Sequence, residues 1–199
     1  MDIKIQKLTP ELVEDYVQFF DKTPHWDNDE TKCYCITWCS DNIYLNGGKH
    51  WFSSSVERKN NAIQRVRNGD IHGYLAYFNN EVIGWCNANT KSDCKESINY
   101  LRTEGGVPLE LCKDGEKIKI IFCFTIAPKI QRMGVATQML EYICRDASNE
   151  NYDFVEAFPS YMSTDPTGDH RGPLEMYLKC GFIKYAEQEN KAVVRKTLK

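Results

Sequence analysis

The sequence predicts an α/β domain in which helices flank a mixed, mostly antiparallel sheet. Strand-like and helix-like segments follow one another along 199 residues, without an internal repeat, a linker or a low-complexity stretch. The strongest signals are a hairpin over 73–88 and a strand joined to a long amphipathic helix over 118–147. The length fits one domain, which we expect to span residues 1–199.

The N-terminal part of the chain predicts one strand and two helices. Residues 3–8 alternate apolar and polar side chains, as a half-buried strand does. Thr9-Pro10-Glu11 then has the cap and first-turn proline of a helix start, with an apolar stripe up to Phe20. Ser54 and Glu57 form a capping box for a second helix, which should end at Asn68-Gly69.

Two less regular insert segments interrupt this order, residues 21–48 and 91–106. The first is rich in Trp, Cys, Tyr and Asn and has no clean period. It is either an irregular helix with a covering loop or an aromatic wall of a substrate pocket. The second is polar, and we expect an exposed excursion with a short helix over 97–102. The aromatic side chains of the first would be Trp26, Tyr34, Trp38 and Tyr44.

The hairpin and the central strand form the middle of the predicted sheet. Two strand-like runs flank Asn79-Asn80, and both residues tolerate the positive φ of a tight turn. In the central strand, apolar residues alternate and should share one face, and Pro128 should end the strand. Residues 135–147 follow with helical spacing of apolar positions. The alternating residues are Ile118, Ile120, Phe122, Phe124 and Ile126.

The connection between this strand and helix, Gln131 to Ala136, predicts an anion site. A strand that leads into a helix through such a loop directs several backbone N–H groups at one place, and the helix dipole adds positive potential. Gly134 lets a ligand approach the backbone closely. The pattern is neither a P-loop nor a dinucleotide fingerprint. The alternative is an ordinary strand–helix connection in which the glycine only eases packing.

The C-terminal part predicts a strand, a helix and a last pair of strands. Residues 152–158 form a strand that Pro159 ends, and a turn-rich loop covers 161–172. A helix begins at Pro173 and ends before Gly181. Residues 182–185 and 191–197 then close the chain as two strands.

Charge and hydropathy exclude some partners. The net charge of −3 and the pI of about 5.9, with no basic block, argue against nucleic acid. No stretch approaches the roughly 18 apolar residues of a membrane helix, so we expect no membrane partner. The N-terminus lacks an apolar signal region, and we expect a cytoplasmic protein.

Nine cysteines are many for this length, and we expect thiols rather than disulfides. Four fall on apolar positions of predicted elements and should be small core residues, Cys86, Cys123, Cys144 and Cys180. Cys33, Cys35 and Cys39 lack the paired Cys-x-x-Cys spacing of structural zinc sites. We therefore expect no metal here, and favour a cysteine-rich pocket wall or packed loop.

Two motifs in this order resemble the GCN5-related N-acetyltransferase (GNAT) family. The first is Gln131-x-x-Gly134-x-Ala136, which is similar to the pyrophosphate loop of that family. The second is Tyr177-x-x-x-Gly181-Phe182, one strand and one loop later. The resemblance covers residues 1–10 and 70–198 and implies a GNAT-like acyl-CoA N-acyltransferase fold. It also implies acetyl-CoA as co-substrate and acetyl transfer to a primary amine by direct attack. Relatives often dimerise, so a homodimer is a candidate state.

The resemblance assigns roles to individual residues. Tyr177 would be the general acid that protonates the leaving thiolate, although a buried core tyrosine is the alternative. A backbone N–H in the Phe124 to Ile126 region would stabilise the oxyanion. Arg132 would add a charged contact to the pyrophosphate. The residues expected to bind acetyl-CoA are Phe124, Thr125, Ile126, Gln131, Arg132, Met133, Gly134, Val135, Ala136 and Thr137.

No motif identifies the base that takes the proton from the amine. Glu156, on the strand after the long helix, is one candidate if its register points it into the cleft. The alternatives are a surface carboxylate on that strand and a chain of water molecules. Glu81 in the hairpin turn is a weaker candidate, because turn carboxylates are usually solvated.

Two other functions stay open at this point. One is a non-catalytic acyl-CoA-binding or sensing module on the same fold. The other is a thiol- or metal-dependent protein built around residues 33–39. The acceptor is not identified by the sequence: a polyamine, an amino sugar, an amino-acid derivative and a peptide N-terminus all fit.

Overall fold

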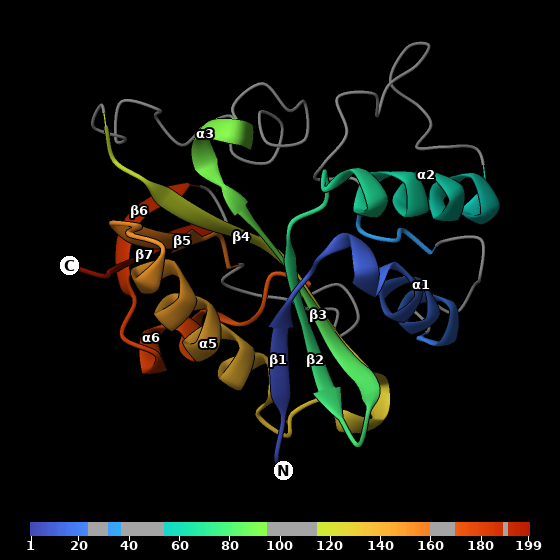
Figure 1. Ribbon diagram of the computed structural model, residues 1–199. Helices are drawn as coiled ribbons and strands as arrows, with labels where there is room; N and C mark the ends of the chain where they lie inside the picture. Colours follow the sequence, from blue (N-terminus) through green and yellow to red (C-terminus); the bar gives the residue numbers. More distant parts are fainter. Residues whose placement is uncertain (24–31, 37–53, 95–114, 160–169, 189–190) are drawn as a thin grey trace.

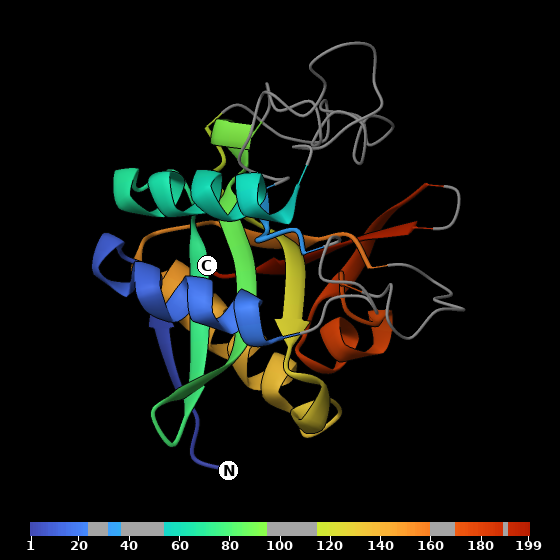
Figure 2. The same cartoon turned by 90° about the vertical axis from the view of Figure 1, so that its right-hand side faces the viewer.

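A computed structural model describes residues 1–23, 32–36, 54–94, 115–159, 170–188 and 191–199. These residues form a seven-stranded sheet with helices on both faces, as Figures 1 and 2 show from two directions. The strand order is β1-β2-β3-β4-β5-β7-β6. Strands β4 and β5 pair in parallel, and the other neighbouring strands pair antiparallel. The predicted α/β class with a mixed, mostly antiparallel sheet is confirmed.

The elements lie close to their predicted positions. The strands are β1 (Lys4–Lys7), β2 (Gly73–Phe78), β3 (Glu81–Thr90), β4 (Ile118–Ile126), β5 (Phe154–Ala157), β6 (Ile183–Gln188) and β7 (Lys191–Thr197). The helices are η1 (Pro10–Leu12), α1 (Val13–Lys22), α2 (Ser55–Asn68), α3 (Lys91–Cys94), η5 (Pro128–Ile130), α5 (Val135–Asn149) and α6 (Leu174–Lys179). Among the described residues, no helix is long and apolar enough to cross a membrane.

The sheet separates two hydrophobic cores. Helices α1 and α2 cover one face, where Tyr16 meets Trp85 edge-on with ring centroids 4.9 Å apart. Helices α5 and α6 cover the opposite face, where Met139 and Tyr177 are fully buried. Because burial of such side chains contributes about 1.5–3 kcal/mol each, the two cores fix the helices against the sheet.

The residues that cap the helices fix the start and end of α2 and the start of α1. Ser54 Oγ accepts a hydrogen bond of 3.1 Å from the Glu57 N–H, which confirms the predicted cap of α2. Gly69 ends that helix in the left-handed conformation, with φ of 77°. Thr9 makes no side-chain cap, and the chain first forms the 3₁₀ turn η1 before it continues as α1.

The segment after β3 differs from its prediction. Residues 91–94 form the short helix α3, and both Lys91 and Cys94 are buried. The prediction of an exposed segment is therefore wrong for residues 91–94, because Lys91 follows β3 directly and pairs with the buried carboxylate of Glu156. The helix predicted over 97–102 lies outside the described residues. Strand β6 also extends beyond Tyr185, to Gln188.

A β-bulge breaks the predicted alternation in β4. Asn87 pairs with Cys123 and the next residue, Ala88, pairs with Ile121, which leaves Phe122 as the extra residue. Phe122 belongs to the core under α1 and α2, whereas Phe124 belongs to the core under α5 and α6. The prediction that all the alternating residues share one face is therefore wrong, since a bulge shifts the side-chain phase by one residue.

Candidate active site

Strands β4 and β5 separate halfway along β4. They pair only over Ile118–Ile121 on β4, opposite Phe154–Ala157. Beyond this point the chain after β5 follows β7 instead, because the Pro159 carbonyl accepts a hydrogen bond of 3.1 Å from the Ala192 N–H. In its second half, β4 therefore has no strand among the described residues paired to the edge that faces β5. We call this the splayed edge, and its backbone groups are available to an extended ligand.

The backbone of β4 shows which groups face the splayed edge. Successive residues of a strand direct their N–H and C=O groups to opposite sides. The Ala127 N–H donates to the Ile83 carbonyl at 2.9 Å, toward the β2–β3 hairpin. Ile126 is the neighbour of Ala127, and Phe124 lies two residues before Ile126. Both therefore direct their N–H groups to the opposite side, the splayed edge. The Phe124 N–H does so, and it donates to the His170 carbonyl at 2.5 Å.

The predicted anion loop leads directly from this edge into α5. Gly134 is the residue before the helix and has φ of 84°, a conformation that favours glycine. Helical bonding begins where the Gln138 N–H donates to the Gly134 carbonyl at 3.0 Å. No side chain caps the helix, and its first turn has no acidic residue. The N–H groups of residues 135–137 are therefore available to an anion.

The space in front of Gly134 is open. A Cβ built at Gly134 would have no described atom within 4 Å, so the glycine is not required by packing inside the chain. Arg132 and Met133 beside it are exposed, and Arg132 also has a positive φ of 63°. Gln131 ties the loop to the strand, because its Nε2 donates to the Ile126 carbonyl at 3.1 Å. The predicted cofactor-binding residues from β4 and the loop therefore adjoin one another.

The close approach of α5 to the sheet depends on Gly84 in β3. A Cβ there would lie 2.9 Å from Ile126 Cδ1 and 3.2 Å from Met139 Sδ. The missing side chain lets Met139 of α5 pack onto the hairpin beside the end of β4. The start of α5 is thereby fixed next to the splayed edge.

Tyr177 lies on α6, on the same side of the sheet as α5. Its side chain is fully buried, and its ring meets that of Phe182 edge-on with centroids 5.3 Å apart. The hydroxyl donates to the Arg171 carbonyl at 2.6 Å. The residue thus has the packing of a core tyrosine and a fixed hydroxyl direction; its role as general acid stays a prediction.

Glu156 lies on the opposite face of the sheet and is buried. It sits across from Ile120, whose side chain packs in the core under α1 and α2. Lys91 Nζ donates to Glu156 Oε1 at 2.7 Å, and Arg195 Nη2 donates to Oε2 at 3.0 Å. Its side chain is only 1% exposed, so the interpretation as a surface carboxylate is wrong.

Lys91 and Arg195 are residues that the sequence reasoning missed. Both are buried, with exposed side-chain fractions of 5% and 6%, and both pair with Glu156. The carboxylate therefore pairs with two cationic side chains inside the sheet, which offsets the cost of its burial. A signal was present for Arg195, because it directly follows the apolar run Ala192-Val193-Val194 in a predicted strand. Nothing in the sequence around Lys91 indicated its partner.

Other polar side chains are buried on the same face. Asn89 Nδ2 donates to Asn87 Oδ1 at 2.5 Å on β3. Thr125 of β4, a predicted cofactor contact, is also buried, and its hydroxyl lies 3.9 Å from Cys123 Sγ. This face of the sheet therefore carries a row of amide, hydroxyl and thiol groups beside the Glu156 ion cluster.

The cysteine-rich segment is described only in part. Cys35 is buried, whereas Cys39 lies outside the described residues. Burial raises the pKa of the Cys33 thiol to about 12, so this thiol is protonated at neutral pH. In the ranges that the structure describes, no group of three His, Cys, Asp or Glu side chains could hold a metal ion. Of the four predicted core cysteines, Cys180 is only partly buried.

Of the predicted aromatic wall, only Tyr34 is described. Its ring packs against Phe20, and its hydroxyl donates to Asp21 Oδ1 at 2.7 Å. Tyr34 is thus a core residue under α1 and α2. Trp26, Trp38 and Tyr44 lie outside the described residues.

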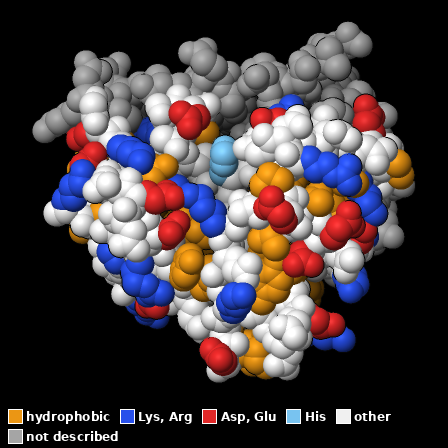
Figure 3. Space-filling view, in the orientation of Figure 1, with side chains coloured by type: hydrophobic (Ala, Val, Ile, Leu, Met, Phe, Trp, Pro, Cys, Tyr) orange, Lys and Arg blue, Asp and Glu red, His pale blue; other side chains and the backbone are white. Residues whose placement is uncertain are grey.

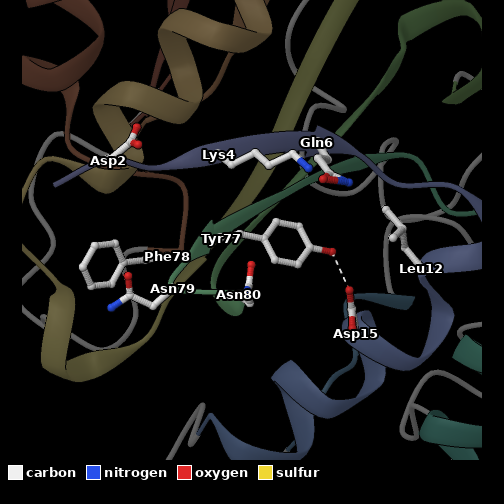
Figure 4. Close-up of a pocket in the computed structure, with 9 residues that line it drawn as sticks. All are labelled: Asp2, Lys4, Gln6, Leu12, Asp15, Tyr77, Phe78, Asn79 and Asn80. Atoms are coloured by element: carbon white, nitrogen blue, oxygen red, sulfur yellow. Dashed lines mark hydrogen bonds between the residues drawn. The ribbon is translucent and has the colours of Figure 1, made fainter.

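A cavity of about 460 Å³ lies away from these groups. Figure 4 shows that it opens beside β1, the hairpin tip and the start of α1, where the Tyr77 hydroxyl donates to Asp15 at 2.8 Å. It contains none of the predicted site residues. On the face seen in Figure 3, basic and acidic side chains are interspersed rather than gathered into a single-sign area.

Comparisons with known proteins agree with this geometry. The sequence model of the Acetyltransferase (GNAT) family matches residues 9–182. No curated protein matches the chain. Among solved structures, a PaiA N-acetyltransferase from Thermoplasma acidophilum, in complex with coenzyme A, has a TM-score of 0.53 and 13% identity. The match covers 99% of each chain.

Two animal proteins share the fold as well. An arylalkylamine N-acetyltransferase-like protein from mosquito has a TM-score of 0.58 and 10% identity over 98% of this chain and 100% of its own. A polyamine N-acetyltransferase from Drosophila melanogaster, which forms N-acetylagmatine, has a TM-score of 0.54 and 9% identity over 98% and 97%. The family match spans most of the sequence, and the splayed strand with its uncapped helix lies inside it: this chain belongs to the GNAT acetyltransferase family.

Proposed function

We propose that this protein transfers the acetyl group of acetyl-CoA to the primary amine of a small molecule. The observation that carries the proposal is the uncapped start of α5, with open space at Gly134, directly after the splayed half of β4. A pyrophosphate fits the N–H groups and the dipole of that helix. The chain from the pyrophosphate to the thioester would then run along the splayed edge, where β4 offers the backbone groups of Ile126.

The reaction uses groups on both sides of β4. A neutral amine attacks the thioester carbonyl, and a backbone N–H of residues 124–126 donates to the oxyanion that forms. The intermediate collapses, the C–S bond breaks, and Tyr177 donates its hydroxyl proton to the thiolate of coenzyme A. Thr125 lies between these donors on the strand and faces the opposite side of the sheet. The positions of Gln131 to Thr137 suit the pyrophosphate.

Glu156 is the candidate for removal of the amine proton. It faces the side of the sheet opposite Tyr177, so an acceptor on its side would reach the thioester through the gap between β4 and β5. Both of its oxygens already accept hydrogen bonds from Lys91 and Arg195. A proton taken directly, or through water, would therefore weaken one of these pairs, and the pH profile of a Glu156→Gln variant tests the assignment.

The test is a screen of amines with acetyl-CoA, read by the mass of the acetylated product. The panel holds polyamines, agmatine, arylalkylamines, amino sugars and peptides with free N-termini. The expected result is product from at least one small amine with the wild type and none with Gly134→Glu. Acetyl-CoA binding without product across the panel would instead indicate a non-catalytic acyl-CoA-binding module. Absence of both binding and product would contradict the proposal.

A further inference from the structure

A short turn, residues 170–172, lies against the splayed edge of β4. The Phe124 N–H, which lies at this edge, donates to the His170 carbonyl at 2.5 Å. That carbonyl takes the place that a continued β5 would have occupied in the ladder. The Phe124 N–H is also one of the groups to which the proposed reaction assigns the acetyl oxygen.

The next carbonyl of the same turn binds the proposed general acid. The Tyr177 hydroxyl donates to the Arg171 carbonyl at 2.6 Å. Two consecutive carbonyls, of His170 and Arg171, thus accept from the proposed oxyanion donor and from the proposed proton donor. A hydroxyl has one proton to donate, so Tyr177 cannot direct it to a thiolate while it binds Arg171. Likewise, a thioester oxygen at Phe124 would compete with the His170 carbonyl for the same N–H.

Gly172 sets the conformation of this turn. Its φ is 77°, and a Cβ there would lie 2.8 Å from Met176 Cε and 3.7 Å from the Tyr177 hydroxyl oxygen. Pro173 follows as the N-cap residue of α6. A side chain at position 172 would strain the backbone at this φ and displace the end of the Met176 side chain, so the closed turn favours glycine.

We propose that residues 170–172 form an autoinhibitory latch, which must leave Phe124 and Tyr177 before the acetyl group can bind. This inference rests on the proposed function and adds a conformational step to it. The start of α5 lies outside the latch, so coenzyme A can bind there while the latch is closed. Acetyl-CoA needs the open latch for its acetyl group. Its apparent affinity is therefore its affinity for the open form multiplied by the fraction of molecules whose latch is open.

The first test compares Gly172→Ala with Gly69→Ala. Both glycines have φ of 77°, but a Cβ at Gly69 would meet nothing within 4 Å, so only Gly172→Ala strains the closed latch. Calorimetry gives the dissociation constants of acetyl-CoA and of coenzyme A for each variant. Gly172→Ala should raise the affinity for acetyl-CoA relative to coenzyme A by roughly five-fold, which corresponds to about 1 kcal/mol. Gly69→Ala should leave this ratio at its wild-type value.

A second measurement needs no variant. In wild-type protein with ¹³C-carbonyl histidine, the His170 signal should move with acetyl-CoA and stay in place with coenzyme A. If that signal is the same with both ligands, or if Gly172→Ala changes both affinities equally, the latch is refuted. If Gly172→Ala does not fold, the carbonyl signal alone decides. If neither ligand binds the wild type, it is the proposed function that fails.

Discussion

The region that begins at the end of β4 and the cluster around Glu156 lie on the same sheet but are built in different ways. The first is continuous in sequence, from Phe124 to Thr137, and the groups that it offers to a ligand are backbone N–H groups. The second joins Lys91, Glu156 and Arg195, which lie far apart in the chain, through side-chain charges. A site made by local backbone geometry is readable from a motif, whereas a site made by strand register is not.

The two regions also differ in how they tolerate change. The start of α5 is open to solvent, so a substitution there should affect ligand binding and leave the fold stable. The Glu156 cluster is buried, so removal of one charge breaks an ion pair inside the sheet and should lower the stability of the fold. The variants below use this contrast, from the largest expected effect to the smallest.

Lys91→Met should destabilise the fold most. The variant leaves Glu156 Oε1 buried without Lys91 while Arg195 still pairs with Oε2, so the loss should be at most about 3–5 kcal/mol, the cost of a broken buried pair. Urea unfolding measures the loss. Lys199→Met is the control, because Lys199 pairs with Asp153 at 2.7 Å on the surface, where solvent screens the pair and its loss should change stability far less. Equal losses for the two variants would show that the Glu156 cluster is not a buried, coupled unit.

Gly134→Glu should abolish acetyl-CoA binding without unfolding the protein. The side chain would enter the open space, and its charge would repel the pyrophosphate at the start of α5. The dissociation constant should rise at least about 100-fold, or about 2.7 kcal/mol, by calorimetry. Gly69→Glu introduces the same strain at the end of α2 and should keep wild-type affinity. Stabilisation of the Gly134→Glu variant by acetyl-CoA in a thermal shift would rule out this binding site.

Tyr177→Phe should lower kcat by about 100-fold, as expected for loss of a general acid. The variant also removes the latch bond to the Arg171 carbonyl, so its affinity for acetyl-CoA should rise rather than fall. Tyr74→Phe is the matched control: Tyr74 is also buried on the α5 side, and its hydroxyl donates to Asp146 at 2.7 Å. Each variant loses a part-buried hydrogen bond of the hydroxyl group, worth about 1 kcal/mol of stability. If kcat falls equally in both, Tyr177 is a structural residue.

Glu150→Gln should have the smallest effect on stability. It measures the contribution of a part-exposed ion pair, with which the buried pairs of Glu156 can be compared. Burial raises the pKa of Glu150, but hydrogen bonds from Lys7 and Lys119 outweigh it and hold the pKa below its usual range. A lowered pKa in the folded state stabilises the fold above the unfolded pKa, and this contribution is lost as the pH falls through the folded pKa.

The side chain is one-third exposed, so we expect a loss of only about 0.5 kcal/mol at pH 7. Urea unfolding of both proteins across pH measures it. The difference between wild type and Glu150→Gln should shrink as the pH falls and vanish once it is below the lowered pKa that Glu150 has in the folded state. A difference that persists in acid would mean that the ion pairs of Glu150 are not its source.

Much of the fold follows from local patterns. The cap of α2 at Ser54, the Asn79-Asn80 turn and the apolar stripe of α5 depend on residues a few positions apart, and each lies where the sequence predicted it. The loop from Gln131 to Ala136 is local in the same sense, because one glycine and the start of one helix define it. Its place between strand and helix was therefore predictable, while its ligand remains a proposal.

Other features depend on contacts between distant segments. The bulge at Phe122 arises from how β4 pairs with β3, and no residue pattern in β4 predicts it. The burial of Lys91 depends on the register that brings Glu156 and Arg195 together on neighbouring strands. The contact between Phe124 and His170 joins a residue that precedes α5 and β5 in the chain to one that follows both.

The sequence by itself thus determined the α/β class, the strand–loop–helix unit and the glycine at the start of α5. Backbone propensity and side-chain periodicity act over a few residues, and those residues are adjacent in the chain. Tertiary structure decided where β4 splays, which face Glu156 occupies and what the Phe124 N–H binds. These depend on strand register and on the packing of separate elements, which fix distances that no local pattern contains.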